Sequence, residues 1–473
     1  MSSPRPASRW TVAVWVGAAV YTVLLSAESI YRHRGYQTSF DLAVYDQLLW
    51  LLSTGHEPFS SLVSRPMLGD HFTPGLVLLT PVYWVGLDLS GLLILQSAAL
   101  GLTAPALFTL GRDAGASPAV AALPAFLWLL SPWVASVNLF EFHPTAFAPA
   151  LITVSVIAAR RDSRALLAGT ALLALSLRED VAVTYVVMGV VLLLTGRRRM
   201  GLAVAMGSAA WLLLAGRIIG SQGDSLEFFG RRFAGDRGDS MGDALVWVLT
   251  HPLEALTDAV ANSGADIVLL LASTGGLALL APVWMLLAVP TLLHNALTAN
   301  AFQHDLLRHY HLLAAAGLFI AAAIGVRRVP KIRGARVVAL VAAPAVAVAL
   351  VGGLVIHDVW IGGQFFDRRS VRTALDRVPP DAAVATTIHL LPHVSQREEV
   401  YALPEPFIPW DWGSPLPRSE LRERAERVRF VALYAGDGPL PYALRAVPIL
   451  RRSGFVEIYR DERITLFERA STD

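Results

Sequence analysis

The fold is decided by the segment Trp10–Ile30, WTVAVWVGAAVYTVLLSAESI, and by the stretch that follows it, Tyr36–Trp50, YQTSFDLAVYDQLLW. A helix of about 20 apolar residues crosses a bilayer, so the first segment predicts a membrane span. Arg5 and Arg9 precede that span, and arginine collects in cytoplasmic loops. We therefore expect a cytoplasmic N-terminus and place the two acids of the second stretch on the outer side.

The composition is that of a protein that crosses the membrane many times. Hydrophobic residues make up 54% of the chain, the mean hydropathy is +0.52 and charged residues account for 16%, against about 25% in soluble domains. The chain has no cysteine, which excludes disulfides, thiolate metal sites and cysteine nucleophiles. No small-residue cleavage site clearly follows the first span, so we expect no cleaved signal peptide. We expect membrane lipids as partners and no nucleic acid.

Arginine-rich loops predict the path of the chain through the membrane. The loops Arg160–Arg164, Arg197–Arg199 and Arg327–Arg336 are expected on the cytoplasmic side. Counting apolar segments between them predicts an all-α polytopic bundle of about eleven spans in the plasma membrane, with an extracytoplasmic C-terminus. Phe72–Gly86 has both ends outside on this count. Its short length and two prolines predict a re-entrant or interfacial helix.

Two parts of the chain differ from this pattern of apolar segments. Residues 221–263 are charged and Gly-rich, and we expect an external loop there, followed by a span over Ala265–Leu280. Residues 1–356 are predicted to form the membrane domain, and residues 357–473 a small extracytoplasmic α/β domain. In that domain AAVATTIHLLPHVSQREEVYAL predicts strand, short helix and strand, SELRERAERV an amphipathic helix, RFVALYA a strand, and VEIYRDERITLFER a closing hairpin.

Most ionisable residues near the apolar segments fall on the outer side of this predicted topology. Such residues are costly in a membrane protein and mark functional sites by default. They come from five loops or helix ends, which can converge at one mouth of a helical bundle. The candidates are Asp41, Asp46, Asp70, His71, Glu141, His143, Arg178, Glu179, Asp180, His304, Asp305, Arg308, His309 and His311.

Several of these residues also have a purely structural explanation. Asp41 suits an exposed loop acid or a helix N-cap as well as a functional group. Asp46 lies five residues later in an amphipathic stretch, which favours a structural role. Asp70 is placed to cap a helix that begins near Phe72. Glu141 and His143 lie between aromatic residues and Pro144, as at the first turn of a helix.

Two motifs are harder to explain as plain loops. Three charges interrupt two apolar runs in LRED, Arg178–Asp180, where a turn would favour Gly or Asn. In HDLLRHYH, His304, Arg308 and His311 stand at i, i+4 and i+7, which predicts one face of a helix. An arginine there suits a phosphate group, which it binds through two parallel hydrogen bonds.

Six stretches of the chain resemble a known family. FDLAVYDQLLWLLSTG, LGDHFTP, NLFEFHP, LRED, HYHLLAAAG and the tail phrase VPPDAAVATTIHLLPHVSQREEVYALP are similar to the bacterial and archaeal membrane family called domain of unknown function 2079. The resemblance covers roughly residues 10–470. That family is grouped with the GT-C membrane glycosyltransferases, which carry a catalytic acid in the first outer loop and take sugar from a polyprenyl-phosphate carrier.

The resemblance implies a function and roles for particular residues. Asp41 matches the catalytic loop acid, and Arg308 matches a basic residue that holds the carrier phosphate; the other outer residues are expected to bind substrate. A polyprenyl-phosphate sugar is the implied donor, and a glycan, lipid or protein outside the cytoplasm the acceptor. The chain lacks the Asp-x-Asp pair of many GT-C enzymes, because Asp41 and Asp46 are five residues apart, which leaves dependence on a divalent metal open.

Two other functions remain open on the sequence. A transporter or flippase would place polar groups near the middle of broken spans, whereas here the acids gather at outer ends. A non-catalytic cell-envelope assembly protein would use its tail to bind a partner.

Overall fold

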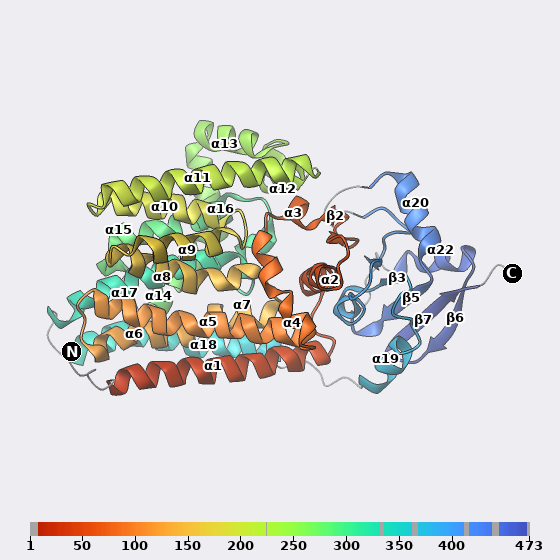
Figure 1. Cartoon of the computed structure of the whole chain (residues 1–473), viewed down its shortest axis with the longest axis horizontal. Coiled ribbons are helices and arrows are strands. Elements are labelled where there is room, and N and C mark those ends of the chain that lie inside the picture. Colours follow the sequence, from red (N-terminus) through yellow and green to blue (C-terminus); the bar gives the residue numbers. More distant parts are fainter. Residues whose placement is uncertain are drawn as a thin grey trace.

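The computed structural model of the chain describes residues 8–223, 225–331, 335–361, 368–410, 416–437 and 444–470. A bundle of apolar helices forms one part and a small mixed sheet the other (Figure 1). Helix α1, Arg9–Arg34, begins at the bundle end far from the sheet. The short helix α2, Phe40–Thr54, is seen nearly end-on between bundle and sheet, so it runs across the ends of the long helices.

Within the described residues, five helical segments are long and apolar enough to cross a membrane. They are α1 Arg9–Arg34, α5 Asp88–Asp113, α11 Arg198–Ser221, α14 Pro252–Ser273 and His309–Val329, which contains α17 Leu312–Gly325. The pair α6 Pro118–Leu129 and α7 Pro132–Phe140, bent by 41°, makes a sixth if it is one span. A mostly helical polytopic protein is thus confirmed, and the count of about eleven spans stays a prediction.

Shorter elements connect these helices, and several are apolar. The apolar ones are Pro144–Arg160 with α8 Ala148–Arg160, α9 Arg164–Leu175, α10 Val181–Leu194, Pro282–Leu297 with α15 Pro282–Met285 and α16 Val289–Leu297, and Ala345–Trp360 at the end of α18 Ala335–Ile356. The others are β1 Phe59–Ser60, β2 Arg65–Pro66, α3 Met67–Asp70 and the 3₁₀ turns η2 Pro144–Phe147, η4 Leu277–Leu280, η5 Leu286–Ala288, η6 Ala301–His304, η7 His309–His311 and η8 Val326–Lys331.

The residues 72–86 do not form one continuous helix. The 3₁₀ helix η1 spans Pro74–Leu79 and α4 spans Pro81–Trp84. Each begins at a proline, which lacks the N–H that would continue the preceding turn. The segment is too short to cross a membrane, and a re-entrant or interfacial position stays a prediction.

The expectation of a loop over residues 221–263 is wrong, and the external position of this segment stays a prediction. The segment contains α12 Ser225–Ala234, η3 Gly235–Arg237, α13 Met241–Thr250 and the first turns of α14, which begins at Pro252 rather than at Ala265. Glycines and charges suggested a loop, but α12 places Phe228 and Phe233 against the protein and its arginines outside. This amphipathic pattern stabilises a helix.

The sheet unit follows the sequence prediction closely. It contains β3 Val384–Thr386, η10 Ile388–His393, β4 Val400–Ala402, α20 Arg418–Arg427, β5 Phe430–Tyr434, β6 Phe455–Arg460 and β7 Ile464–Arg469, with α19 Arg368–Leu375, η11 Ala435–Asp437 and α22 Val447–Arg452 around them. The strand order is β4-β3-β5-β7-β6, parallel for β4, β3 and β5 and antiparallel for the β6–β7 hairpin. α18 ends at Ile356 and is followed by the π-helical turn η9 His357–Ile361; the domain boundary at residue 356 stays a prediction.

Basic residues gather at the bundle end away from the sheet. Arg161 pairs with Asp113 at 2.6 Å and Arg197 with Asp162 at 2.5 Å, which brings three of the connecting segments together there. Arg333, from the third predicted cytoplasmic loop, lies outside the described residues. The bundle therefore has one arginine-rich end and one end covered by α2 and the sheet, which is the asymmetry that the positive-inside rule associates with orientation. The orientation itself stays a prediction.

Candidate functional site

Asp41 lies in the first turn of α2 rather than in a loop. Its side chain is 41% exposed and faces His143, whose Nε2 is 3.3 Å from Asp41 Oδ2. The protein atoms packed around Asp41 raise the pKa of its carboxyl. The hydrogen bond and charge of His143, with the charges of Arg308 and His71, outweigh that effect, so the net pKa lies below its ordinary value. Asp41 is thus an ionised, accessible carboxylate at neutral pH.

Glu141 holds the start of α2 in place. Its carboxylate accepts hydrogen bonds from the backbone N–H of Ser39 at 2.8 Å and of Leu42 at 2.7 Å, and from the Ser39 hydroxyl. These N–H groups belong to the helix N-terminus, where they lack partners within the helix. Burial and the negative charge of Asp41 raise the pKa of Glu141 to about 7. Glu141 is therefore a capping group that positions α2, and its carboxylate is directed at backbone.

The contact between His143 and Asp41 favours a positive charge between the two side chains. The His143 Nδ1 is 3.3 Å from the Glu141 carbonyl oxygen. A carbonyl only accepts, so Nδ1 carries a proton in this contact. The other ring nitrogen, Nε2, faces the Asp41 carboxylate. A proton or a metal cation between Nε2 and the carboxylate would satisfy both groups.

His309 completes a group that can hold a metal ion. Its ring stacks on that of His143 with centroids 3.6 Å apart, and its buried Nδ1 has no hydrogen-bond partner among the described residues. One ligand atom each from Asp41, His143 and His309 lie within 4.8 Å of one another. Two imidazoles and a carboxylate form a donor set that divalent transition metals accept. The Glu141 carbonyl, bonded to His143 Nδ1, fixes the ring as outer partners of metal ligands do.

Arg308 lies beside this group but not on a helix. Its backbone is extended between η6 and η7, so the prediction that His304, Arg308 and His311 share one helical face is wrong. The side chains of Asn300 and Asp305 accept hydrogen bonds from the backbone N–H groups of Phe302 and Leu307, which replaces helical hydrogen bonds with local turns.

The guanidinium of Arg308 is held by aromatic rings and one acid. Its Cζ is 4.3 Å from the centre of the Phe302 ring and 5.3 Å from that of Phe140, and its Nε is 3.4 Å from Asp305. His304 and His311 point elsewhere. His304 Nε2 donates to the Thr298 carbonyl at 2.9 Å, and His311 contacts Asn295 at 3.3 Å. These two histidines fix the loop that carries Arg308.

A second charged group lies around the turn between α9 and α10. His71 Nδ1 donates to Glu179 at 2.8 Å, and the other Glu179 oxygen accepts from the Phe72 N–H at 2.9 Å. Burial disfavours the charge on His71, but Glu179 and Asp70 outweigh it and raise the pKa of His71 to about 9. Burial likewise raises the pKa of Glu179, but His71 and Arg178 lower it to about 2.

The remaining charges of this second group are paired locally. Arg178 donates to Asp180 at 2.8 Å, and Arg65 to Asp70 at 3.1 Å. Since His71 helps to lower the pKa of Asp41, the two groups are close enough for their charges to act on one another. The structure thus brings together residues from α2, α3 and the ends of α7, α9 and η6.

Asp46 is placed apart from both groups. It is fully buried and accepts hydrogen bonds from Tyr83 at 2.6 Å, Ser395 at 2.5 Å and Gln396 at 3.3 Å. Two of these partners belong to the sheet unit. The structural role favoured by the sequence pattern agrees with these contacts.

Sequence reasoning missed Phe140 and Tyr45. The Phe140 ring stacks on His143 and His309 at centroid distances of 5.7 and 5.9 Å. Tyr45 lies one turn after Asp41 on α2 and meets the His143 ring edge-on at 6.2 Å. The sequence NLFEFHP could have indicated this, because aromatic residues flank Glu141 there and such rings restrict the orientation of the groups between them.

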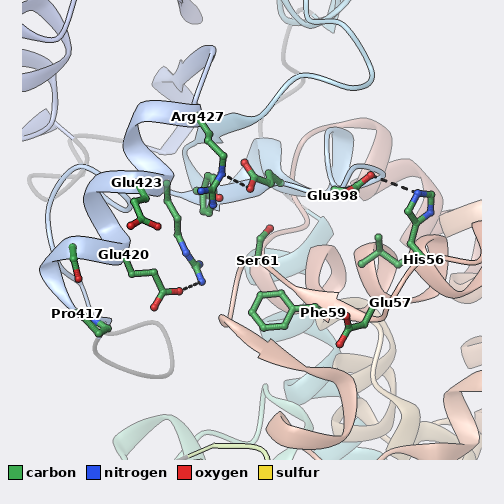
Figure 2. Close-up of a pocket in the computed structure, with 14 residues that line it drawn as sticks. His56, Glu57, Phe59, Ser61, Glu398, Pro417, Glu420, Glu423 and Arg427 are labelled. Atoms are coloured by element: carbon green, nitrogen blue, oxygen red, sulfur yellow. Dashed lines mark hydrogen bonds and ion pairs between the residues drawn. The ribbon is translucent and has the colours of Figure 1, made fainter.

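Two cavities lie away from Asp41, where the sheet unit meets the end of α2. One, of about 660 Å³, is lined by His56, Glu57, Phe59, the residues of α20 and the edge near β4 (Figure 2). The other, of about 1020 Å³, includes Trp50, His56 and His393. Most charges of the first are already paired, as in Arg427–Glu399 and Arg424–Glu420. The candidate catalytic and binding residues therefore do not line these two cavities.

Two solved structures share the fold of nearly the whole chain. The crystal structure of ArnT from Cupriavidus metallidurans bound to undecaprenyl phosphate matches with a TM-score of 0.56 and 13% identity, over 96% of this chain and 98% of that one. ArnT in the apo state gives a TM-score of 0.52 and 14% identity, over 95% and 98%. No curated protein matches the chain in sequence. The class defined by these observations is a multi-pass membrane protein with an ArnT-like fold.

The chain belongs to the family described as "Predicted membrane protein (DUF2079)", whose model matches residues 33–428. This confirms the resemblance carried by the sequence motifs. The matched region contains α2, both charged groups and the first strands of the sheet unit.

Proposed function

We propose that this protein transfers a sugar from a polyprenyl-phosphate carrier to an acceptor outside the cytoplasm. The observation that carries the proposal is the juxtaposition of Asp41, His143 and His309 beside Arg308, at the bundle end covered by the sheet. The ArnT-like fold supports it, because one of the two ArnT structures holds undecaprenyl phosphate, a lipid of the proposed carrier class without its sugar.

Asp41 is the proposed general base. A hydroxyl oxygen of the acceptor attacks the anomeric carbon of the sugar, the bond between that carbon and the phosphate oxygen breaks, and the proton of the hydroxyl passes to Asp41. General-base assistance of this kind is worth about 10²–10⁴ in rate. The exposed side chain of Asp41 suits this role, because an accessible carboxylate that is ionised at neutral pH can accept a proton.

The leaving lipid phosphate needs positive charge nearby. Arg308 supplies a permanent cation whose orientation Phe140 and Phe302 restrict, and its planar fork suits phosphate oxygens. A divalent cation bound by Asp41, His143 and His309 would supply a Lewis acid for the same oxygens.

The proposed location follows from the two ends of the bundle. The positive-inside rule assigns the arginine pairs to the cytoplasmic face. The site lies at the opposite end of the bundle, which this rule assigns to the outer face of the plasma membrane. A polyprenyl tail would remain in the bilayer while its phosphate reaches Arg308. The acceptor, which is a glycan, a lipid or a protein, would approach from the side of the sheet unit.

The test is Asp41→Asn in the purified protein, reconstituted in lipid nanodiscs. The variant keeps the size of the side chain and removes its basicity. We expect at least a 100-fold loss in sugar transfer from a panel of undecaprenyl-phosphate monosaccharides to a cell-envelope extract. Affinity for undecaprenyl phosphate should stay within about twofold, because Arg308 is untouched.

The matched control is Asp113→Asn, the same change at the opposite end of the bundle. Asp113 is the last residue of α5 and pairs with Arg161 at that end of the bundle, away from the proposed site. It should leave turnover within about twofold of the unmodified protein. Equal turnover of Asp41→Asn and the unmodified protein would remove Asp41 from the mechanism, and a transfer-inactive unmodified protein would favour the transporter or assembly function.

A further inference from the structure

The helix that carries Asp41 is anchored to the sheet unit through two buried polar side chains. Asp46 and Gln47 are both fully buried in the middle of α2. Buried polar groups are costly unless every donor and acceptor is satisfied. Asp46 meets Tyr83, Ser395 and Gln396, as described above.

Gln47 uses both ends of its amide. Its Nε2 donates to the carbonyl oxygens of Arg397 and Glu398 at 3.1 Å each and to the Ser61 hydroxyl at 2.8 Å. Its Oε1 accepts from the Ser60 hydroxyl at 2.9 Å and the Ser61 N–H at 3.1 Å. One side chain of α2 thereby joins the segment before β4 to strand β1.

Ser61 closes the connection. Its hydroxyl donates to the Val400 carbonyl at 2.7 Å and accepts from the Val400 N–H at 2.9 Å. Figure 2 shows Ser61 where the α2–β1 region meets the sheet unit. The segment 395–400 is itself rigid, because the buried Arg397 donates to the carbonyls of Val394, Pro379 and Ala382.

We propose that the segment 395–400 of the sheet unit positions Asp41 for catalysis, by fixing the rotation and location of α2 through Asp46, Gln47 and Ser61. Five residues separate Asp41 from Asp46, about 7.5 Å along a helix axis, so a small rotation at the anchor displaces the Asp41 carboxylate relative to His143. The Glu141 cap holds the N-terminal end of α2, and Asp46 and Gln47 hold its middle, so the two anchors together fix the helix against rotation. This inference rests on the proposed function for its kinetic consequence.

The test uses Ser61→Ala and Ser395→Ala in the full-length protein in nanodiscs. Each removes a hydroxyl outside α2 and leaves Asp41, His143 and Arg308 unchanged. We expect kcat for transfer from an undecaprenyl-phosphate monosaccharide to fall about 10- to 100-fold, as for a displacement of about 1 Å in a reacting group. The Kd for undecaprenyl phosphate should stay within twofold, and hydrogen exchange should accelerate in residues 40–54.

Thr54→Ala is the matched control. Thr54 lies in the last turn of the same helix and is exposed. Within the described part of the chain, its hydroxyl bonds only to the carbonyls of Trp50 and Leu51 and to His56. It should change neither kcat nor exchange in residues 40–47. A purely structural role would lower the melting temperature and the amount of active protein in both serine variants but leave kcat per active site unchanged.

The outcomes separate this inference from the proposed function. Unchanged exchange in α2 of both serine variants overturns the anchor, whether or not the protein transfers sugar. Faster exchange with an unchanged kcat overturns the positioning role while the transferase stands. Faster exchange in a protein whose unmodified form transfers no sugar keeps the anchor and overturns the function.

Discussion

At the scale of single residues, the pair of His71 and Glu179 makes the site dependent on pH. Glu179 lowers the free energy of the protonated His71, and His71 lowers that of the ionised Glu179. The pKa of His71 is raised from 6.5 to about 9, so its contribution to stability is complete below pH 6.5 and is lost as the pH rises through 9. The pKa of Glu179 is lowered from 4.5 to about 2, so its contribution is present above pH 4.5 and is lost as the pH falls through 2.

Glu179→Gln is expected to lower the melting temperature most between pH 5 and 7, and less at pH 10, where His71 is neutral in the unmodified protein as well. The amide still accepts from the Phe72 N–H, so the change removes mainly the charge. Glu227→Gln is the control. Its exposed pair with Arg231 should contribute little at any of these pH values. An equal loss of melting temperature at pH 6 and pH 10 for Glu179→Gln would contradict the linkage.

At the scale of elements, two glycines allow α10 and α11 to pack at close range. A Cβ added at Gly201 would lie 2.6 Å from the Gly189 carbonyl oxygen and 2.7 Å from the Leu193 nitrogen. Small residues permit such close approach between helices in membranes. Gly201→Val should therefore force the helices apart at a cost of about 1–3 kcal/mol, seen as a lower melting temperature in detergent.

Gly207→Val provides the comparison on the same helix. A Cβ added at Gly207 meets nothing within 4 Å, so the same change there should alter the melting temperature much less. Equal losses for the two variants would show that the effect comes from valine in the helix and not from the contact between α10 and α11.

The elements also show how far the sequence alone predicts this fold. Short apolar runs predict β3 and β5 correctly, and both strands are buried on both faces. Apolar residues interleaved with charged ones predict the β6–β7 hairpin, which is partly exposed. The residues 301–311 match the spacing of a helix, but turns made by Asn300 and Asp305 prevail there. Local side-chain hydrogen bonds of this kind are not visible in a period of apolar residues.

The site was predictable as a set of residues but not as an arrangement. The sidedness of the charges indicated that Asp41, Glu141, His143 and Arg308 belong to one end of the bundle. The pairing of Asp41 with His143, and the use of Glu141 as a cap, depend on α2 lying across the ends of the long helices. That placement is set by the buried contacts of Asp46 and Gln47 with residues 395–398, which are about 350 positions away in the chain.

At the scale of the whole molecule, the separation of the arginine pairs from the sheet unit predicts which end faces the cytoplasm. By the positive-inside rule, loops rich in Lys and Arg stay in the cytoplasm. Asp162, which pairs with Arg197, should therefore be cytoplasmic. Helix α20, at the other end of the molecule, should be extracytoplasmic. The chain has no cysteine, so single introduced cysteines report position without further changes. Asp162 and Arg422 suit the purpose, because their side chains are 74% and 83% exposed.

With a membrane-impermeant maleimide, Arg422→Cys should be labelled in intact spheroplasts, and Asp162→Cys only after lysis. Both should be labelled in purified protein, which controls for local reactivity. The reverse pattern would place Asp41, Arg308 and the sheet unit in the cytoplasm. Transfer to an outer acceptor would then be impossible for this site, because the acceptor hydroxyl must reach Asp41 from the side on which the sheet unit lies.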